Sequence, residues 1–279
     1  MLVPGALRPI TDTEIEAFAI DGVVCLRGVV APATVEAMGG PVAAAVAGVA
    51  GADLTAMADA LTGAEPTGRR GRFYAGVDHW REDRAFWAFA SDSALPGIAA
   101  AVLRSDAVWL YEDSVLVKEP GTLEPTSFHT DASYFHVAGD QACTVWAPLD
   151  PVTLDTGSLI FVKGSHRWER EFRPNLFVTR DAIPGTVGDE VPDLDAEEYE
   201  LLSFDLEPGD ITVHHYRTLH GARGNASTSV PRRAISVRYC GDDVRYRFRP
   251  GAPRKTHHAT VADGDPLGGP DCPQVWPRA

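Results

Sequence analysis

The chain has 279 residues, of which 44% are hydrophobic and 23% charged, and its formal net charge is −14. This composition excludes a collagen-like, coiled-coil or wholly disordered chain, and the length suits one large domain. Because so acidic a surface repels phosphate, we expect no nucleic-acid partner. We also expect no membrane partner, because no run of 18 apolar residues occurs, and no signal peptide, because a basic leader is missing.

The first predicted elements are a helix and a strand. The sequence Thr11-Asp-Thr-Glu14 fits a capping box, in which a hydroxyl and a carboxylate satisfy free N–H groups at the start of a helix. Gly22 is a typical C-terminal stop. Residues 23–26, Val-Val-Cys-Leu, then predict a strand.

The N-terminal part as a whole is typical of helix. Residues 32–62 are rich in alanine and should be largely helical. Residues 81–103 predict one or two more helices, broken at Pro96. We therefore predict a mostly helical segment over residues 1–105.

From residue 108 onward, short segments rich in β-branched and aromatic residues alternate with turn signals. The predicted strands are 108–118, 126–130, 142–147, 158–163, 211–216 and 233–240. Because no helical pattern separates them, they favour an antiparallel sandwich, jelly roll or barrel. We predict a mainly β protein with flanking helices, a single domain over 1–279 whose jelly-roll core spans 106–241.

Two segments stand apart from this pattern. Residues 181–210 contain eleven acidic residues and no Lys or Arg. They are either a solvated insert between strands or a mobile cover over a pocket. Residues 250–279 are rich in Gly and Pro and predict an irregular tail.

The cysteines Cys25, Cys143, Cys240 and Cys272 have no C-x-x-C spacing. They predict free thiols in a reducing compartment, and hence a cytoplasmic protein.

The first candidate for chemistry is the pair His129 and Asp131 in the sequence Ser-Phe-His-Thr-Asp. Residues two apart on a strand point to the same face. A neutral imidazole and a carboxylate side by side are two of the three ligands of a facial-triad iron site. The alternative is a hydrogen-bonded His–Asp pair without a metal.

A third ligand is available about ninety residues downstream, where His214, His215 and His220 compete. The first two are adjacent, so on a strand at most one of them points inward. We favour His220, because Gly221 lets the backbone pass close to a bulky centre. A jelly roll brings such distant strands together.

Arg232 opens the strand that follows His220. A guanidinium buried in a barrel needs an anionic partner, and a dicarboxylate cosubstrate would supply one in bidentate geometry. Without a metal site, Arg232 would be an ordinary surface or ion-paired arginine.

Together, the order H-x-D, His-Gly and Arg resembles the phytanoyl-CoA dioxygenase family of iron(II)- and 2-oxoglutarate-dependent oxygenases. The segments 115–121, 143–150, 156–166 and 208–210 strengthen the resemblance, which runs from about residue 11 to 241. It implies a double-stranded β-helix, the cupin-like form of the jelly roll.

The resemblance also implies roles for individual residues. It makes His129, Asp131 and His220 the iron ligands. It makes Arg232 the partner of the distal carboxylate of 2-oxoglutarate, with Arg233 as the fallback.

The resemblance further implies that Trp146 is an aromatic wall beside the cosubstrate, the alternative being a core tryptophan. The chain departs from the family at two places. Ala222 stands where members often have a small hydroxyl residue, and no lysine occurs near Gly76. These departures concern the anchoring of the cosubstrate rather than the metal ligands.

The implied activity is an iron(II)-, 2-oxoglutarate- and O₂-dependent dioxygenase that hydroxylates, or otherwise oxidises a C–H bond of, a small organic metabolite and releases succinate and CO₂. A role in secondary metabolism and a monomeric or homodimeric state are further expectations. A group of aromatic residues could line the substrate pocket: Trp80, Trp87, Tyr134, Phe135, His136 and Tyr216. The alternatives are a zinc-type metallohydrolase and a metal-free jelly-roll binding module.

Overall fold

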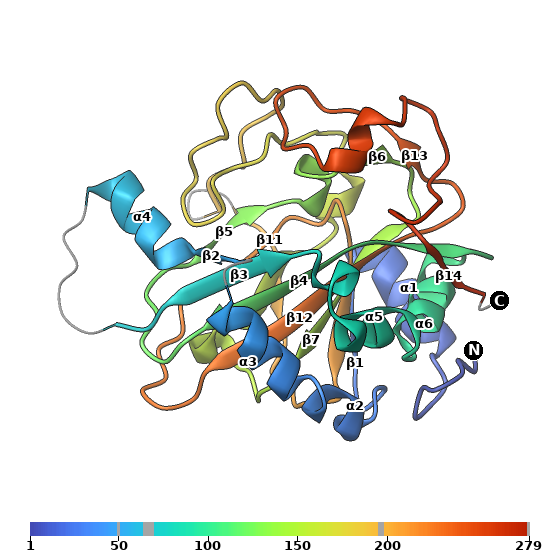
Figure 1. Ribbon diagram of the computed structural model, residues 1–279, viewed down its shortest axis with the longest axis horizontal. Helices are drawn as coiled ribbons and strands as arrows, with labels where there is room; N and C mark the ends of the chain where they lie inside the picture. Colours follow the sequence, from blue (N-terminus) through green and yellow to red (C-terminus); the bar gives the residue numbers. More distant parts are fainter. Residues whose placement is uncertain (49–50, 64–69, 195–197, 278–279) are drawn as a thin grey trace.

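The computed structural model describes residues 1–48, 51–63, 70–194 and 198–277. Two antiparallel sheets face each other, and helices cover the outer side of the larger one (Figure 1). Its strands, in spatial order, are β1 (Val23–Leu26), β10 (Ile211–His215), β7 (Ala142–Pro148), β12 (Arg232–Cys240), β4 (Val108–Lys118), β3 (Phe73–Val77) and β2 (Ala52–Asp53), with β14 (Gln274–Trp276) also pairing with β4. The smaller sheet has the order β5 (Thr126–His129), β11 (His220–Ala222), β8 (Leu159–Val162) and β9 (Leu201–Ser203).

The remaining elements connect or cover these sheets. A two-stranded pair consists of β13 (Arg245–Tyr246) and β6 (Val137–Ala138). The α-helices are α1 (Asp12–Asp21), α2 (Pro32–Glu36), α3 (Gly39–Ala47), α4 (Leu54–Thr62), α5 (Arg84–Ser91) and α6 (Leu95–Leu103). Short 3₁₀ turns are η1 (His79–Arg81), η2 (Asp131–Ser133), η3 (Leu154–Thr156), η4 (Ser165–Arg167) and η5 (Thr256–Ala259). The predicted mainly β jelly roll with flanking helices is confirmed.

The alternation of side chains along the large sheet divides the core in two. On the outer face, Val115, Val145 and Ile235 pack against the helices. On the inner face, Trp146 and Ala234 pack against the smaller sheet. Strand β4 is buried along nearly its whole length although Glu112, Asp113 and Ser114 interrupt its hydrophobic pattern. Asp113 accepts a hydrogen bond from Trp80 on the helical side, whereas Glu112 and Ser114 line the inner side of the sheet.

All six predicted core strands are present, with ends shifted by no more than two residues. The first helix has the predicted capping box, since the Thr11 hydroxyl and the Glu14 carboxylate each accept from the other's backbone N–H, and Gly22 ends it at φ 80°. The predicted break at Pro96 is wrong. The helical structure is interrupted between α5 and α6. Pro96 lies in the first turn of α6, where its lack of an N–H leaves no helical hydrogen bond unmade.

The N-terminal part is less uniformly helical than predicted. Residues 32–62 form three helices, with the short strand β2 between the second and the third; residues 49–50 lie outside the described part. The unpredicted strand β3 pairs with β4 and extends the large sheet. Its sequence, Phe-Tyr-Ala-Gly-Val, is short and contains a glycine, so it carries a weak strand signal.

The acidic segment 181–210 is tied to the preceding chain. Asp189 pairs with Arg170 at 2.9 Å, Glu190 with Arg173, and Asp193 with Arg180 at 3.4 Å. The acidic segment contains no basic residue of its own, so its ion-pair partners come from the residues just before it. Residues 195–197 lie outside the described part.

The predicted irregular tail needs a correction. Residues 274–276 form β14, which pairs with the start of β4, and residues 256–259 form the turn η5. Figure 1 shows this segment (red) and the loop after β8 (yellow) arching over the same side of the molecule in this view. Residues 278–279 lie outside the described part.

By length and composition alone, the stretch 84–103 could cross a membrane, but 78% of its apolar window is buried inside the protein. It corresponds to α5 and α6, which pack against each other and the large sheet. Core helices of this kind pass the same test, so the stretch is weak evidence for a membrane span.

One buried carboxylate should make stability depend on pH. Burial raises the pKa of Asp113 to about 7, although its carboxylate accepts a hydrogen bond from the Trp80 amide at 3.1 Å. Between about pH 4 and pH 7 the folded chain therefore binds a proton that the unfolded chain has lost, so the free energy of unfolding falls as pH rises through this window. We expect Asp113→Asn to raise that free energy at pH 8, by up to about 4 kcal/mol, and the gain to vanish towards pH 4.

Urea unfolding of both proteins between pH 4 and pH 8 checks this expectation. Asp140→Asn is the control, because that side chain is 78% exposed and its replacement removes no buried charge. An Asp113→Asn effect that is equal at all pH values would contradict the assignment.

Candidate active site

Three of the sequence-predicted side chains meet at one point. The potential ligand atoms of His129, Asp131 and His220 all lie within 4.8 Å of one another, and all three residues are buried. His129 and His220 are direct partners in the pairing of β5 with β11. The sequence predicts Asp131 on the same strand face as His129. In the structure it lies just beyond the strand, as the first residue of η2, where the chain turns after His129.

The two imidazoles are held in the same way. Nδ1 of His129 lies 2.7 Å from the carbonyl oxygen of Ser127, and Nδ1 of His220 lies 2.9 Å from that of Thr218. Since a carbonyl only accepts, each Nδ1 must carry the proton. The lone pair of each neutral ring is therefore on Nε2, which is the form that binds a metal.

Burial also keeps both rings neutral. It lowers the pKa of His129 to about 3 and that of His220 to about 4, each with a further contribution from a neighbouring histidine. Near neutral pH both rings can therefore act as ligands without first losing a proton.

The carboxylate of Asp131 is held ionised. Burial by itself would raise its pKa, but His214, Arg238 and His220 outweigh burial and hold it well below the usual value. Thr144 donates a hydrogen bond to Oδ2, and His214 Nε2 lies 3.4 Å from the same oxygen. The other oxygen, Oδ1, lies 3.9 Å from Arg238.

The competing histidines lie outside the ligand group. His214 is behind the Asp131 carboxylate, with its ring centroid 4.4 Å from that of His220. His215 points to the other side of β10, where its ring contacts Phe18. The prediction that at most one of the adjacent histidines faces inward is confirmed.

Arg232 lies beside this group with its charge uncompensated. It is 1% exposed, and no acidic side chain in the described part of the chain forms an ion pair with it. Its Nη1 lies 3.4 Å from the Leu116 carbonyl, and its Nε has no hydrogen-bond partner. Burial lowers its pKa to about 10, which leaves it charged near neutral pH.

A small inner pocket connects Arg232 to two of the three ligands, His129 and His220. Its wall is formed by Leu116, Thr126, His129, Thr144, Trp146, Leu159, Phe177, His214, His220, Arg232, Ser236 and Arg238. Trp146 is buried, and its ring centroid lies 5.9 Å from the Arg232 guanidinium. The pocket thus has a buried cation at one side and a set of metal-type ligands at the other.

Arg233, the fallback candidate, does not face this pocket. Its guanidinium forms a two-pronged ion pair with Asp150, the shortest contact being 2.6 Å. The alternation of side chains along β12 explains the difference, because adjacent residues point to opposite faces. Of these two arginines, Arg232 is therefore the one that lines the inner pocket.

Sequence reasoning missed Lys118, which lies opposite Arg232 in the pairing of β4 with β12. It is fully buried, donates to the Arg223 carbonyl at 2.6 Å and lies 4.5 Å above the Phe73 ring. Burial, and then the charge of Arg232, lower its pKa well below the usual value. This end of the barrel is therefore rich in hydrogen-bond donors, with Arg232 as its charged group.

A larger cavity of about 360 Å³ opens in front of His129 and Asp131. Of the aromatic residues proposed for it, Tyr134 and Phe135 do line it. Trp80 and Trp87 instead pack in the helical core. His136 is outside its wall, and Tyr216 lines a different hollow. Phe177, which the sequence analysis did not single out, also lines the cavity, with its ring centroid 5.1 Å from that of His129.

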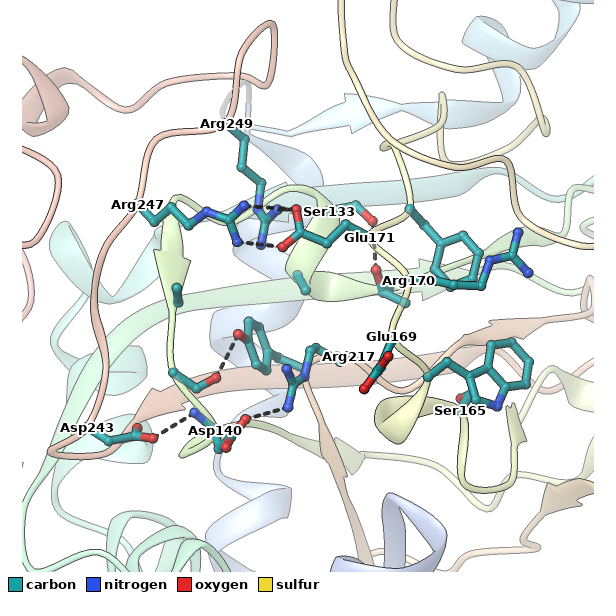
Figure 2. A pocket seen from close by; sticks show the side chains of 17 residues that line it. Ser133, Asp140, Ser165, Glu169, Arg170, Glu171, Arg217, Asp243, Arg247 and Arg249 are labelled. Atoms are coloured by element: carbon teal, nitrogen blue, oxygen red, sulfur yellow. Dashed lines mark hydrogen bonds and ion pairs between the residues drawn. The ribbon is translucent and has the colours of Figure 1, made fainter.

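That second hollow, of about 430 Å³, lies across η2 and contains none of the three ligands. Figure 2 shows its charged side chains directed at one another: Arg247 and Arg249 towards Glu171, and Arg217 towards Asp140. Because these charged side chains pair largely with one another, the described wall of this hollow presents no group comparable to the His–Asp–His ligands or to Arg232.

A family model described as phytanoyl-CoA dioxygenase (PhyH) matches residues 18–234. The probable alpha-ketoglutarate-dependent hypophosphite dioxygenase of Stutzerimonas stutzeri is 31% identical over 128 residues, 45% of this chain and 43% of that protein. The probable phytanoyl-CoA dioxygenase of Caenorhabditis elegans is 27% identical over 130 residues, 46% of this chain and 40% of that protein. The alignments thus span less than half the length of these curated relatives.

A solved structure extends the likeness of fold over nearly the whole chain. The non-heme alpha ketoglutarate dependent carbocyclase SnoK from nogalamycin biosynthesis superposes with a TM-score of 0.70, 23% identity, and coverage of 98% of this chain and 99% of that one. Since the family model covers most of the chain, the chain belongs to the phytanoyl-CoA dioxygenase family.

Proposed function

We propose that this protein is an iron(II)- and 2-oxoglutarate-dependent dioxygenase. One observation carries the proposal: the two histidines of a buried His–Asp–His group share a small pocket with a buried arginine that has no acidic partner in the described part of the chain. Two imidazoles and one carboxylate are the ligand set of non-haem iron(II) oxygenases. The unpaired guanidinium fits a dicarboxylate, which would supply the missing negative charge.

The residues would divide the work as follows. Nε2 of His129 and His220 and a carboxylate oxygen of Asp131 hold the ion. Arg232 binds the distal carboxylate of 2-oxoglutarate, and Trp146 forms the wall beside it. With O₂, the bound iron and cosubstrate supply the oxidising power that breaks a C–H bond, with release of succinate and CO₂.

The chain's own contribution is to orient the reactants and keep water out. The Ser127 and Thr218 carbonyls fix the two rings, and Thr144 fixes the carboxylate. We propose hydroxylation as the reaction, because the carboxylate ligand leaves no room for a halide. A small organic metabolite of secondary metabolism is the proposed substrate, supported by the likeness to a carbocyclase of nogalamycin biosynthesis.

The direct test is succinate formation from 2-oxoglutarate by protein loaded anaerobically with iron(II) and then exposed to O₂. We expect iron-dependent succinate release, which zinc does not support. Zinc-dependent hydrolysis without succinate would favour the metallohydrolase, and failure to bind either metal or 2-oxoglutarate would favour a binding module.

We expect Thr144→Val to weaken iron(II) binding by about 10–100-fold, the usual effect of losing a hydrogen bond to a ligand. Thr212→Val is a matched control, because Thr212 is also a buried strand residue but its hydroxyl has no partner. Metal titration under nitrogen measures both affinities. Equal affinities in the two variants would mean that the Thr144 hydrogen bond does not support the ligand.

We also propose that the chain forms one oxygenase domain, acts in the cytoplasm and is monomeric or homodimeric. Its four free cysteines suit a reducing compartment.

A further inference from the structure

The wall of the large cavity contains equal numbers of opposite charges. Its ionic side chains are Asp78, Glu112, Asp131, Arg238, Arg254 and Lys255. Three are acidic and three basic, so the wall is neutral as a whole. An iron(II) ion with 2-oxoglutarate, a dication with a dianion, would leave that balance unchanged.

The buried charges of the cavity are already paired, whereas Arg254 is exposed, with its guanidinium 4.2 Å above the Phe248 ring. Lys255 Nζ lies 2.8 Å from both Asp78 and Glu112. Burial alone would lower the pKa of Lys255, but these carboxylates outweigh burial and raise it. Arg238 lies 3.8 Å from Glu112 and 3.9 Å from Asp131. A charged guest would have to break these pairs or lie unpaired beside them, and a buried unpaired charge is strongly unfavourable.

The hydroxyl groups of the cavity wall are similarly engaged. The Tyr111 hydroxyl accepts from the His136 amide at 3.2 Å. The Tyr134 hydroxyl donates to the side chain of Asn175 at 2.8 Å. Ser114 Oγ accepts from Arg238. Of the buried side-chain groups described in this wall, Nε2 of His258 and Nε of Arg238 are left without a partner, so few hydrogen-bonding groups remain to replace the hydration of a strongly polar guest.

The rest of the wall is apolar and rich in aromatic rings. It comprises Leu54, Ala75, Val77, Leu116, Phe135, Phe177 and Pro253, with the rings of Tyr111 and Tyr134 between them. The cavity volume, about 360 Å³, lies within the range of pockets that bury a drug-sized ligand.

We propose that the substrate is an uncharged molecule built on aromatic or fused rings, and that neither a coenzyme A thioester nor a small anion is accepted. This rests on the proposed function and names the substrate class of the same site. Ring faces and edges of Tyr134, Phe135 and Phe177 would contact the guest. The paired charges of Lys255, Asp78 and Glu112 would reject guests that carry a net charge.

The test compares probes that differ in charge. Protein loaded with iron(II) and 2-oxoglutarate under nitrogen is dialysed against 1,8-dihydroxyanthraquinone, its 3-carboxylate derivative, or decanoyl-coenzyme A. We expect the neutral quinone to bind about tenfold or more tightly than its carboxylate, and decanoyl-coenzyme A to bind more weakly still. A carboxylate or thioester that binds as tightly as the neutral quinone, or no binding of the neutral quinone, would overturn the proposal.

Variants show whether the probe occupies this cavity. Ala75→Trp fills the cavity and should abolish binding of the quinone, whereas Ala60→Trp on the exposed side of α4 should leave it unchanged. Retained binding in Ala75→Trp places the probe elsewhere and counts against the proposal. Succinate release without added substrate by the unmodified protein tests the proposed function separately. If succinate is released but a charged probe binds more tightly than the neutral quinone, the proposed function stands and only the substrate class is wrong.

Discussion

Replacing Asp131 with alanine is expected to reduce iron-dependent succinate formation to the background of metal-free protein. Asp131 supplies the only negative charge among the three grouped ligands, and its carboxylate lies in a buried setting where water cannot readily replace it. Two neutral imidazoles alone form a weak site for a hard divalent ion. Metal titration should show the loss of affinity directly.

The fold should survive this substitution. Arg238, one neighbour of the carboxylate, keeps its contacts with Glu112 and Ser114, and Thr144 lies within a regular strand. Asp140→Ala is the control for removing a carboxylate as such, because Asp140 is exposed and outside the cavity wall. A folded Asp131→Ala protein with full iron-dependent turnover would refute the ligand assignment.

The candidate site could be predicted from the sequence where it depends on motifs. His129, Asp131 and His220 were identified because their residue types and order are specific, even though η2, rather than a strand, positions Asp131. The family resemblance favoured Arg232 over Arg233 but kept Arg233 as the fallback, because the two are adjacent basic residues at the start of one strand. The register of β12 against β4 and β7 separates them.

Other contributions could not be predicted because they depend on contacts between distant segments. Lys118 is beside Arg232 only because β4 pairs with β12. Lys255 belongs to the segment that the sequence predicts as an irregular tail, and it enters the cavity wall through ion pairs with Asp78 and Glu112. Phe177 reaches His129 from a loop without regular structure. Local patterns carry no information about such contacts.

Replacing Arg232 with methionine should leave the stability of the protein unchanged or raise it, while weakening the binding of 2-oxoglutarate. A buried guanidinium without an acidic partner is costly to the fold, so an apolar side chain of similar length should leave the melting temperature of the metal-free protein unchanged or raise it. The same change removes the proposed partner of the distal carboxylate. Losing one member of a buried charge pair costs about 2–5 kcal/mol, so the KM for 2-oxoglutarate should rise by about thirtyfold or more.

Two comparisons make this result specific to Arg232. Arg233→Met removes a cation of the same strand that is already paired with Asp150, so it should lower stability slightly and leave the KM for 2-oxoglutarate unchanged. A 2-oxo acid that lacks the distal carboxylate, 2-oxovalerate, should bind the unmodified protein and Arg232→Met equally weakly. Because a ligand that binds only the folded state raises the melting temperature, 2-oxoglutarate should stabilise the Arg233→Met protein but not the Arg232→Met protein. The reverse pattern would assign the distal carboxylate to Arg233, and equal stabilisation of both variants by 2-oxoglutarate would make Lys118, opposite Arg232, the next cation to substitute.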